Sequence, residues 1–410
     1  MDPFGIPADV VARRVEELGE VGRLPEGGLY RGVYTPAWAA ARAVVAEWGR
    51  AAGLEVGEDA VGNLWLRLPG TEPGPAIVTG SHIDTVRNGG KYDGALGIIA
   101  GLTAVEVLKA RFGRPKRTLE VLATCEEDGA RFRSRLWGSR AILGIIRPEE
   151  PDSILDAEGI SIGEAMRRLG FDPARIPEAR RDDIGAFIEL HIEQGPVLET
   201  SGHQVGIVTV VTGLTMAVAE VTGRADHAGT TPMDARRDAL VGAARMILAV
   251  RRAALAAGPP AVATVGRIEA WPGGSNVVPE RVRFTIDIRH TDEDQLRRLE
   301  NRVARACRQV ARNCDLGLDF RVVSSTPPTP LDPALRRLLV DLAGGLGLKF
   351  LEMPSGAGHD AAWLARRFPA AMIFVPSRDG RSHSPLEYTP VEQITPGITL
   401  LAAALHRLAY

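Results

Sequence analysis

The chain has 410 residues, more than a single hydrophobic core usually serves, so two domains are expected. Its formal net charge of −2 at pH 7 argues against binding to nucleic acid or to an anionic membrane surface. Hydrophobic residues make up 45% of the chain, but no apolar run could cross a bilayer and no secretory leader is evident, so we expect a cytoplasmic globular protein.

The first half of the chain alternates helical and strand patterns. Helices are predicted at 35–53 and 96–113, and strands at 60–68, 76–80, 117–124 and 185–190. One more buried strand is predicted near the C-terminus, at 370–376. Strands that alternate with helices favour an α/β fold with a mostly parallel sheet and helices on both of its faces.

The middle of the chain follows a different order. Strands are predicted at 206–223, 261–270, 281–290 and 317–323, and helices at 233–258 and 292–314. This order is typical of a ferredoxin-like α+β arrangement. We therefore expect an inserted domain at 211–325, with 324–330 as its exit linker, and a second domain made of 1–210 and 326–410.

The three cysteines cannot pair into a disulfide framework. Cys307 and Cys314 lie on an apolar stripe with helical spacing, which favours small buried side chains. Cys125 precedes two glutamates and could be a nucleophile. The structural interpretation is favoured because no cysteine-protease signature surrounds it.

Side chains that can bind metal follow three of the predicted strands. His82 comes after 76–80, Glu126 and Glu127 come after 117–124, and His191 directly follows 185–190. In parallel sheets, ligand-binding residues gather beyond the carboxyl ends of the strands. We therefore expect these side chains to meet at one edge of the sheet.

Five residues are candidate metal ligands: His82, Asp93, Glu127, His191 and His383. Neutral imidazoles and carboxylates suit divalent first-row transition ions. Asp93 is suited to bridge two such ions, because Gly89, Gly90 and Gly94 let its loop fold back toward the strand end.

Two acidic residues have expected roles beside the ligands. Asp84 lies two residues after His82 on an extended backbone, so its carboxylate can accept the second ring N–H of that histidine. Glu126 and Glu127 divide into a base and a ligand, since a metal-bound carboxylate cannot shuttle protons freely. Each motif alone has an ordinary explanation, such as a structural histidine or a solvated acidic loop. Their joint occurrence at strand ends favours a site.

Nine short segments carry a family signature. They are GSHIDTVRNGGKYDGALG, EEDGARF with GSRA, ELHIEQGPVLE, GRADHAGTTPM, GGSNVVP, DIRH, SGAGHDA and SHSPLEY. In this order they resemble the amidase/carbamoylase branch of the M20 metallopeptidase superfamily. That branch includes N-carbamoyl-L-amino-acid hydrolases, 3-ureidopropionases and allantoate amidohydrolases.

The resemblance implies a dinuclear catalytic domain interrupted by a lid and dimerisation domain, and hence a homodimer. By the family pattern His82 and His191 bind one ion. Glu127 and His383 bind the other, and Asp93 bridges the two. Zinc, manganese, cobalt and nickel all tolerate this ligand set.

The resemblance also implies catalytic and substrate-binding roles. Glu126 is the expected general base, supported by Asp84 and His227, and His227 is expected to act on the partner subunit's site. The expected substrate contacts are Gln194, His227, Asn276, Arg289, Gly358 and His359. Arg289 suits bidentate capture of a carboxylate, although it could instead pair with a carboxylate on its own sheet. Asn276 could simply be a turn residue.

The leading expectation is hydrolysis of the N-carbamoyl group of N-carbamoyl-L-amino acids to amino acid, carbon dioxide and ammonia. Allantoate and 3-ureidopropionate are the alternative small ureido-acid substrates. A hypothesis from another class is a metal-free binding protein on the same scaffold. The complete ligand set with Glu126 disfavours that hypothesis.

Overall fold

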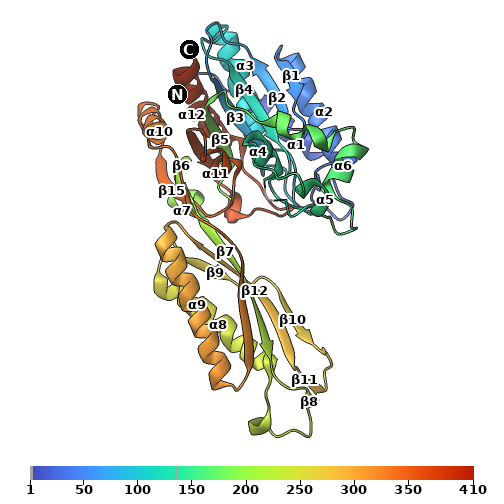
Figure 1. The fold of residues 1–410 in the computed structure, drawn as a ribbon. Coiled ribbons are helices and arrows are strands. Elements are labelled where there is room, and N and C mark those ends of the chain that lie inside the picture. The colour runs from blue at the N-terminus through green and yellow to red at the C-terminus, as the bar shows by residue number, and fades with distance from the viewer. Residues whose placement is uncertain (1–2, 135) are drawn as a thin grey trace. The chain divides into compact units, whose positions relative to one another are not determined.

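The computed structural model describes residues 3–134 and 136–410. These residues divide into two compact units, and each is described by itself (Figure 1). The first unit runs to Thr209 and resumes at Pro330, and the second is Val210–Thr329. Among the described residues, no helix combines the length and the apolar character of a transmembrane span.

A sheet of nine strands, counted over the described residues, forms the centre of the first unit. Its middle strands are neighbours in the order β4 (Leu119–Thr124), β3 (Ala76–His82), β5 (Ile184–Ile192) and β16 (Ala370–Val375), and they run parallel. Antiparallel strands β2 (Leu64–Leu68) and β1 (Glu55–Glu58) extend one side. The other side carries β6 (Val205–Val211), β14 (Thr329–Pro330) and β15 (Phe350–Ser355). The predicted α/β class is confirmed.

Helices cover both faces of this sheet. Ala361 N in α11 (Asp360–Leu364) donates to Glu189 Oε2 of β5 at 2.9 Å. A Cβ on Gly397 of α12 (Val391–Ala409) would lie 3.1 Å from the next residue of that strand, Leu190. Because successive strand residues face opposite sides, α11 and α12 cover opposite faces.

The remaining helices of the first unit complete the layers around the sheet. α3 (Ala95–Phe112) packs against α12 and β3, and its buried residues surround most of its circumference. The others are α1 (Ala8–Gly19), α2 (Pro36–Ala51), α4 (Trp137–Ile142), α5 (Glu150–Ser153), α6 (Ile162–Arg168), α7 (Val197–Ser201) and α10 (Pro333–Gly345), with 3-10 turns η1 (Pro173–Ala179) and η3 (Arg378–Gly380).

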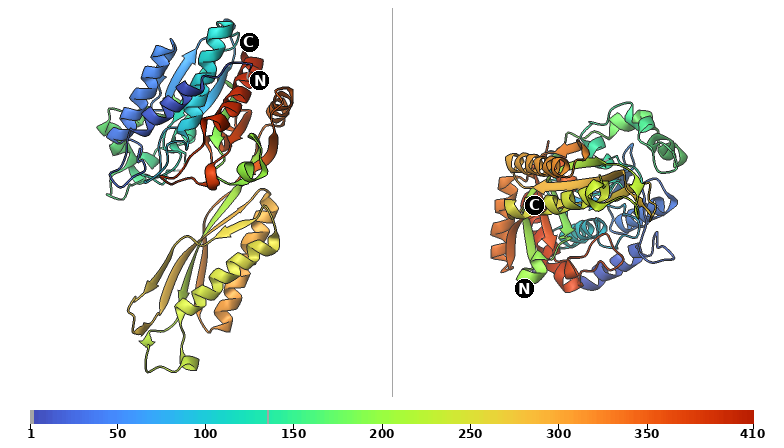
Figure 2. Two further views of the ribbon diagram at one scale, coloured as in Figure 1. Left: turned by 180° about the vertical axis from the view of Figure 1, so that it is seen from behind. Right: turned by 90° about the horizontal axis from the view of Figure 1, so that it is seen from below.

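The second unit is an antiparallel sheet with two helices packed on it (Figure 2). Its strands lie in the order β10 (Ile268–Trp271), β12 (Arg281–His290), β7 (Gly213–Thr222) and β13 (Gly317–Thr326), and β9 (Val262–Thr264) also pairs with β12. The helices are α8 (Ala239–Ala257) and α9 (Glu293–Asn313). A separate ribbon pairs β8 (Asp226–His227) with β11 (Val277–Val278), and η2 (Met233–Ala235) precedes α8. The connectivity is ferredoxin-like, as predicted.

Three boundaries differ from the prediction. The strand predicted at 206–223 is interrupted at Thr212, and its halves β6 and β7 belong to different sheets. β13 continues to Thr326, so the first residues of the predicted linker pair with β7 as strand. The helix predicted from residue 233 begins at Ala239, because the Asp238 carboxylate caps two amide N–H groups of its first turn.

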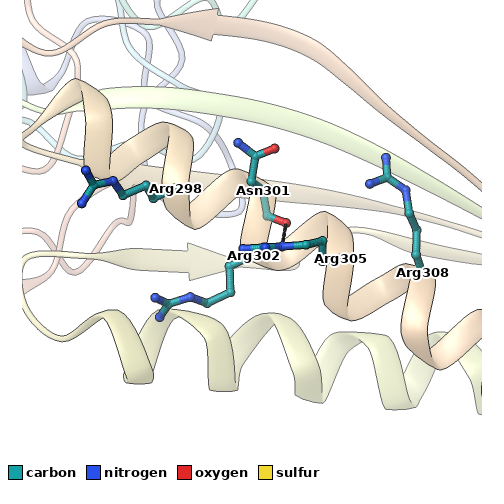
Figure 3. Close-up of a pocket in the computed structure, with 5 residues that line it drawn as sticks. All are labelled: Arg298, Asn301, Arg302, Arg305 and Arg308. Atoms are coloured by element: carbon teal, nitrogen blue, oxygen red, sulfur yellow. Dashed lines mark hydrogen bonds between the residues drawn. The ribbon is translucent and has the colours of Figure 1, made fainter.

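The exposed side of α9 is basic. Arg298, Arg302, Arg305 and Arg308 surround a concavity on this helix together with Asn301 (Figure 3). Within the described part of the chain, no ion pair joins these four arginines to a carboxylate. Positive charge is therefore concentrated here, and two copies of this face would repel one another.

Candidate metal centre

Three parallel strands deliver polar side chains to one edge of the first unit's sheet. His82 is the last residue of β3, and His191 lies next to the last residue of β5. Glu126 and Glu127 follow the end of β4 after one intervening residue, Cys125. The strands are neighbours and parallel, so these residues share the carboxyl edge of the sheet, as predicted.

The Asp93 carboxylate lies among three imidazole rings. Its Oδ1 is 3.2 Å from His191 Nε2 and 3.5 Å from His82 Nε2. Its Oδ2 is 3.1 Å from His383 Nε2. The two oxygens of one carboxylate thus face different imidazoles, which is the arrangement that a bridging ligand needs.

Of the four groups of possible ligand atoms among the described residues, two share Asp93. One group contains His82, Asp93 and His191, and the other contains Asp93, Asp128 and His383, with all atoms of a group within 4.8 Å. Glu127, the predicted partner of His383, has its Oε2 3.9 Å from His82 Nε2. The structure therefore groups the three predicted histidine ligands around Asp93 and adds Asp128 to them, whereas Glu127 lies nearest to His82 and its pairing with His383 stays a prediction.

Backbone carbonyls orient two of the histidine ligands. His82 Nδ1 lies 3.1 Å from the Asp84 carbonyl oxygen, and His191 Nδ1 lies 2.9 Å from that of Ile192. A carbonyl oxygen only accepts, so each Nδ1 carries a ring proton, and each Nε2, which faces Asp93, is the nitrogen available to a cation.

Asp84 differs from the expectation in what its carboxylate does. The side-chain oxygen is 3.8 Å from His82 Nδ1, farther away than the Asp84 carbonyl oxygen. The carboxylate instead accepts the amide N–H groups of Glu127 and Asp128, each at 3.1 Å. Asp84 therefore orients the segment that carries these two acids as well as contacting His82.

The charges of the cluster depend on one another. Burial alone would raise the pKa of the Asp93 carboxyl, but its contacts with the three imidazoles hold that pKa well below the usual range. Burial would lower the pKa of His82, but the hydrogen bond to Asp93 and the charges of the nearby carboxylates together outweigh it, so this pKa lies well above the usual value. Contacts with Asp128 and Asp93 raise the pKa of His383 to about 10. The surplus of negative charge that favours these protons would equally favour a divalent cation.

The residues present fit divalent transition ions. Imidazole nitrogens and carboxylate oxygens are suitable ligands for them. Glu126 Oε2 and Gln194 Oε1 are buried acceptors with no hydrogen-bond partner among the described residues. A bound cation and water would supply partners to such acceptors.

Glu126 is held in an unusual backbone conformation. Its φ is +55°, and its side chain is buried. Oε1 accepts the amide N–H of Phe132 at 2.7 Å, and the preceding amide, of Cys125, donates to Asn63 Oδ1 at 3.0 Å. The surrounding bonds thus determine where this carboxylate points.

Burial raises the pKa of the Cys125 thiol well above its usual value, which agrees with its structural interpretation.

Three predicted substrate residues adjoin the centre in the first unit. Gln194 Nε2 donates to Asp93 Oδ2 at 3.0 Å. His359 is buried, and its ring centroid lies 4.7 Å from that of His191. A Cβ on Gly358 would lie 4.0 Å from Glu127 Oε1. Their substrate roles remain predictions.

His227, Asn276 and Arg289 belong to the second unit. The strand that carries His227 pairs with β11 directly after Asn276, so these two residues are neighbours. Arg289 Nε and a terminal guanidinium nitrogen donate to the two carboxylate oxygens of Asp287 at 2.9 and 2.8 Å. That pairing on the sheet is the alternative that the sequence left open for Arg289.

Three polar residues around the centre were missed by the sequence analysis. They are Asp128, Glu189 and Glu387. Glu189 accepts the Ser81 hydroxyl at 2.6 Å, and Glu387 accepts the amide N–H of Asp93 at 3.0 Å. Each lies inside a quoted motif, and strand alternation places Glu189 on the same face as His191. That alternation was a usable signal for Glu189.

Gly94 is expected to be essential for metal binding. A Cβ at this position would lie 2.5 Å from atoms of the His82 ring, and its φ of +65° strains any L side chain. We expect Gly94→Ala to displace the imidazole and to weaken manganese binding about 10- to 100-fold in calorimetric titrations of metal-free protein.

Gly113→Ala is the matched control. Gly113 ends the helix that Gly94 begins, and it has a φ of +76°, but a Cβ there would meet nothing within 4 Å. Its variant should bind manganese like the wild type. Wild-type affinity in Gly94→Ala would contradict the account.

Comparison with known proteins supports the family resemblance that the sequence motifs indicate. Residues 78–407 match the profile of peptidase family M20/M25/M40. The chain is 41% identical over 394 residues to an allantoate amidohydrolase of Escherichia coli K12, with 96% of each protein covered. It is 40% identical over 403 residues to an N-carbamoyl-L-amino-acid amidohydrolase of Paenarthrobacter aurescens, covering 97% of this chain and 98% of the relative. A hydantoinase/carbamoylase-family amidase from Burkholderia multivorans matches the structure with a TM-score of 0.91 at 33% identity, covering 98% of both chains. The chain belongs to peptidase family M20/M25/M40.

Proposed function

We propose that the protein is a metal-dependent amidohydrolase that removes the N-carbamoyl group of N-carbamoyl-L-amino acids, releasing amino acid, carbon dioxide and ammonia. The observation that carries this proposal is Asp93, whose two oxygens face different imidazoles. The two relatives described above act on different ureido compounds and are nearly equally identical to this chain. Allantoate is therefore the first alternative substrate, and 3-ureidopropionate is the second.

The proposed cofactors are two divalent ions of zinc, manganese, cobalt or nickel. His82 and His191 would hold one ion, Glu127 and His383 the other, and Asp93 both. When bound, the ions supply Lewis acidity toward a water molecule and toward the carbonyl group that is cleaved. Asp128 is the alternative carboxylate beside His383.

Glu126 is the proposed general base. The amide N–H of Phe132 holds Oε1, which leaves Oε2 without a partner among the described side chains and able to accept a proton. Glu126 takes that proton from the attacking water and passes it to the leaving nitrogen as the C–N bond breaks.

His227 is suited to stabilise the oxyanion that develops during this attack. Its Nδ1 accepts the amide N–H groups of Gly229 and Thr230 at 3.0 and 3.3 Å, so the ring proton lies on Nε2 and can be donated. Asn276 would bind the substrate beside it. Arg289 would bind the substrate carboxylate while it shares or releases Asp287.

Distances within the second unit support a homodimer. The β8–β11 ribbon lies at the end of the sheet where β7 ends and β12 begins (Figure 1). Arg289 is eight residues along β12 from its first residue, Arg281, or about 26 Å at the usual rise of an extended strand. A ureido acid is much shorter, so we infer that His227 and Arg289 contact one substrate from two different chains. The dimer contact should avoid the arginine face of α9, where like charges repel.

We also propose a cytoplasmic location for the enzyme. The cysteines at 125, 307 and 314 are all free thiols. Free thiols and the absence of disulfides are typical of proteins in a reducing compartment.

A substrate panel tests the reaction directly. Metal-depleted protein is reconstituted with each of the four metals and assayed with N-carbamoyl-L- and D-amino acids, allantoate, 3-ureidopropionate and dipeptides. We expect kcat/KM for N-carbamoyl-L-amino acids to exceed the others by about tenfold or more, and a chelator to abolish turnover.

The other outcomes of this panel are equally informative. A preference for allantoate would make allantoate the substrate in place of N-carbamoyl-L-amino acids and would leave the proposed mechanism unchanged. Turnover of dipeptides alone would contradict the amidohydrolase proposal. A protein that binds amino acids tightly but almost no metal would favour the binding-protein hypothesis.

Mixing two variants tests the shared site. We expect Glu126→Gln and His227→Ala each to lower kcat by about 10²- to 10⁴-fold while metal content stays unchanged. Co-expressed in equal amounts, they should form mixed dimers half of the time, each with one complete site. Activity should then return to about a quarter of the wild-type value.

The control for this experiment is a mixture in which every chain lacks the Glu126 carboxylate. Glu126→Gln co-expressed with the Glu126→Gln/His227→Ala double variant should stay inactive. If the first mixture also stays inactive although mixed dimers have formed, both residues serve one chain's own site.

A further inference from the structure

Glu387 links the loop that follows His383 to the loop that carries Asp93. Its side chain is buried, with 3% of the residue exposed. One carboxylate oxygen, Oε1, accepts the successive amide N–H groups of Tyr92 and Asp93, at 2.9 and 3.0 Å. The backbone at Asp93 is therefore held by a residue that lies almost three hundred positions later in the chain.

The other oxygen of Glu387 holds the segment that presents His383. Oε2 accepts the hydroxyl of Ser382 at 2.8 Å, and Ser382 directly precedes His383. The same hydroxyl oxygen lies 3.2 Å from Asp93 Oδ2 and accepts Gln194 Nε2 at 3.1 Å. One carboxylate thus contacts two of the three segments that supply ligands to the proposed second ion, those of Asp93 and His383.

The local packing leaves little room for the two loops to separate. A Cβ on Gly90 would lie 2.3–2.4 Å from side-chain atoms of Glu387, so the glycine loop rests directly on this side chain. The rings of Tyr92 and Tyr388 pack edge to face at 5.8 Å. His383 itself has a φ of +53°, a conformation that neighbouring contacts have to maintain.

We propose that Glu387 is a positioning residue that sets the separation of Asp93 and His383 and thereby the affinity for the second cation. This inference rests on the proposed dinuclear centre and extends it. The first ion depends on His82, His191 and Asp93, and neither histidine is hydrogen-bonded to Glu387. Loss of Glu387 should therefore lower the binding affinities of the two ions by unequal factors.

Calorimetric titration with manganese, applied to the full metal-depleted chain, measures this difference without any substrate. We expect two ions in the wild type. In Glu387→Ala the first ion should lose little affinity, because both of its histidines keep their own contacts, and the second ion should bind about 10- to 100-fold more weakly. Glu387→Gln should restore both ions, because its carbonyl oxygen can accept the two amides and its NH₂ group can donate to Ser382.

Two further variants keep the test decisive. Asp332→Ala is the matched control, because Asp332 also accepts two successive amide N–H groups, of Ala334 and Leu335, at the start of α10. It should retain both ions. If Glu387→Ala does not fold, Glu387→Asp withdraws the carboxylate by one methylene and should still weaken the second ion selectively.

A coupling measurement adds a readout that general destabilisation would not give. In His383→Ala the second ion lacks the ligand that Glu387 is proposed to position. Removing Glu387 as well should therefore have no further effect, and Glu387→Ala/His383→Ala should bind manganese like His383→Ala alone. Equal weakening of both ions, no weakening in Glu387→Ala, or a wild type with one ion would each overturn the proposal. Two ions with this pattern in a protein that hydrolyses no ureido acid would overturn the proposed function and leave this inference standing.

Discussion

The centre of this protein depends on one buried carboxylate, Asp93, that faces three imidazoles at once. Buried charges are costly unless they are paired, so the surroundings of Asp93 have to supply both charge and fixed geometry. Arg31 contributes a positive charge close to Asp93 and its neighbouring carboxylates. It is fully buried and donates to the carbonyl oxygen of Ile83, between His82 and Asp84, while burial lowers its pKa to about 10. Gly94 and Glu387 hold the Asp93 loop from its other sides.

The fold explains how residues from distant segments reach this carboxylate. Parallel neighbours β4, β3 and β5 end at the same edge, so the segments after them need only short loops to converge. The strand ends supply the rigid part of the site, whereas Asp93 and His383 come from loops. These loops are held by hydrogen bonds to side chains and by a backbone bridge between Gly89 and Leu29, and not by the central sheet. We expect the loop-borne half of the centre to respond most strongly to changes at surrounding residues.

Sequence reasoning predicted most elements and the meeting of His82, Asp93 and His191, because strand ends and glycine turns leave local signals. It did not predict that the Asp84 carbonyl oxygen, and not its carboxylate, would be nearest to His82 Nδ1. It also missed Glu387, since a hydrogen bond between segments far apart in the chain has no periodic pattern. The prediction of one continuous strand at 206–223 was wrong. Alternation continues through Thr212 and cannot show where a chain leaves one sheet for another.

The central claim is that Asp93 joins two cations. Anomalous diffraction from crystals grown with manganese tests it most directly. The account predicts two peaks about 3.5–4 Å apart, each within ligand distance of a different oxygen of Asp93. A single peak, or two peaks of which only one contacts Asp93, would contradict it.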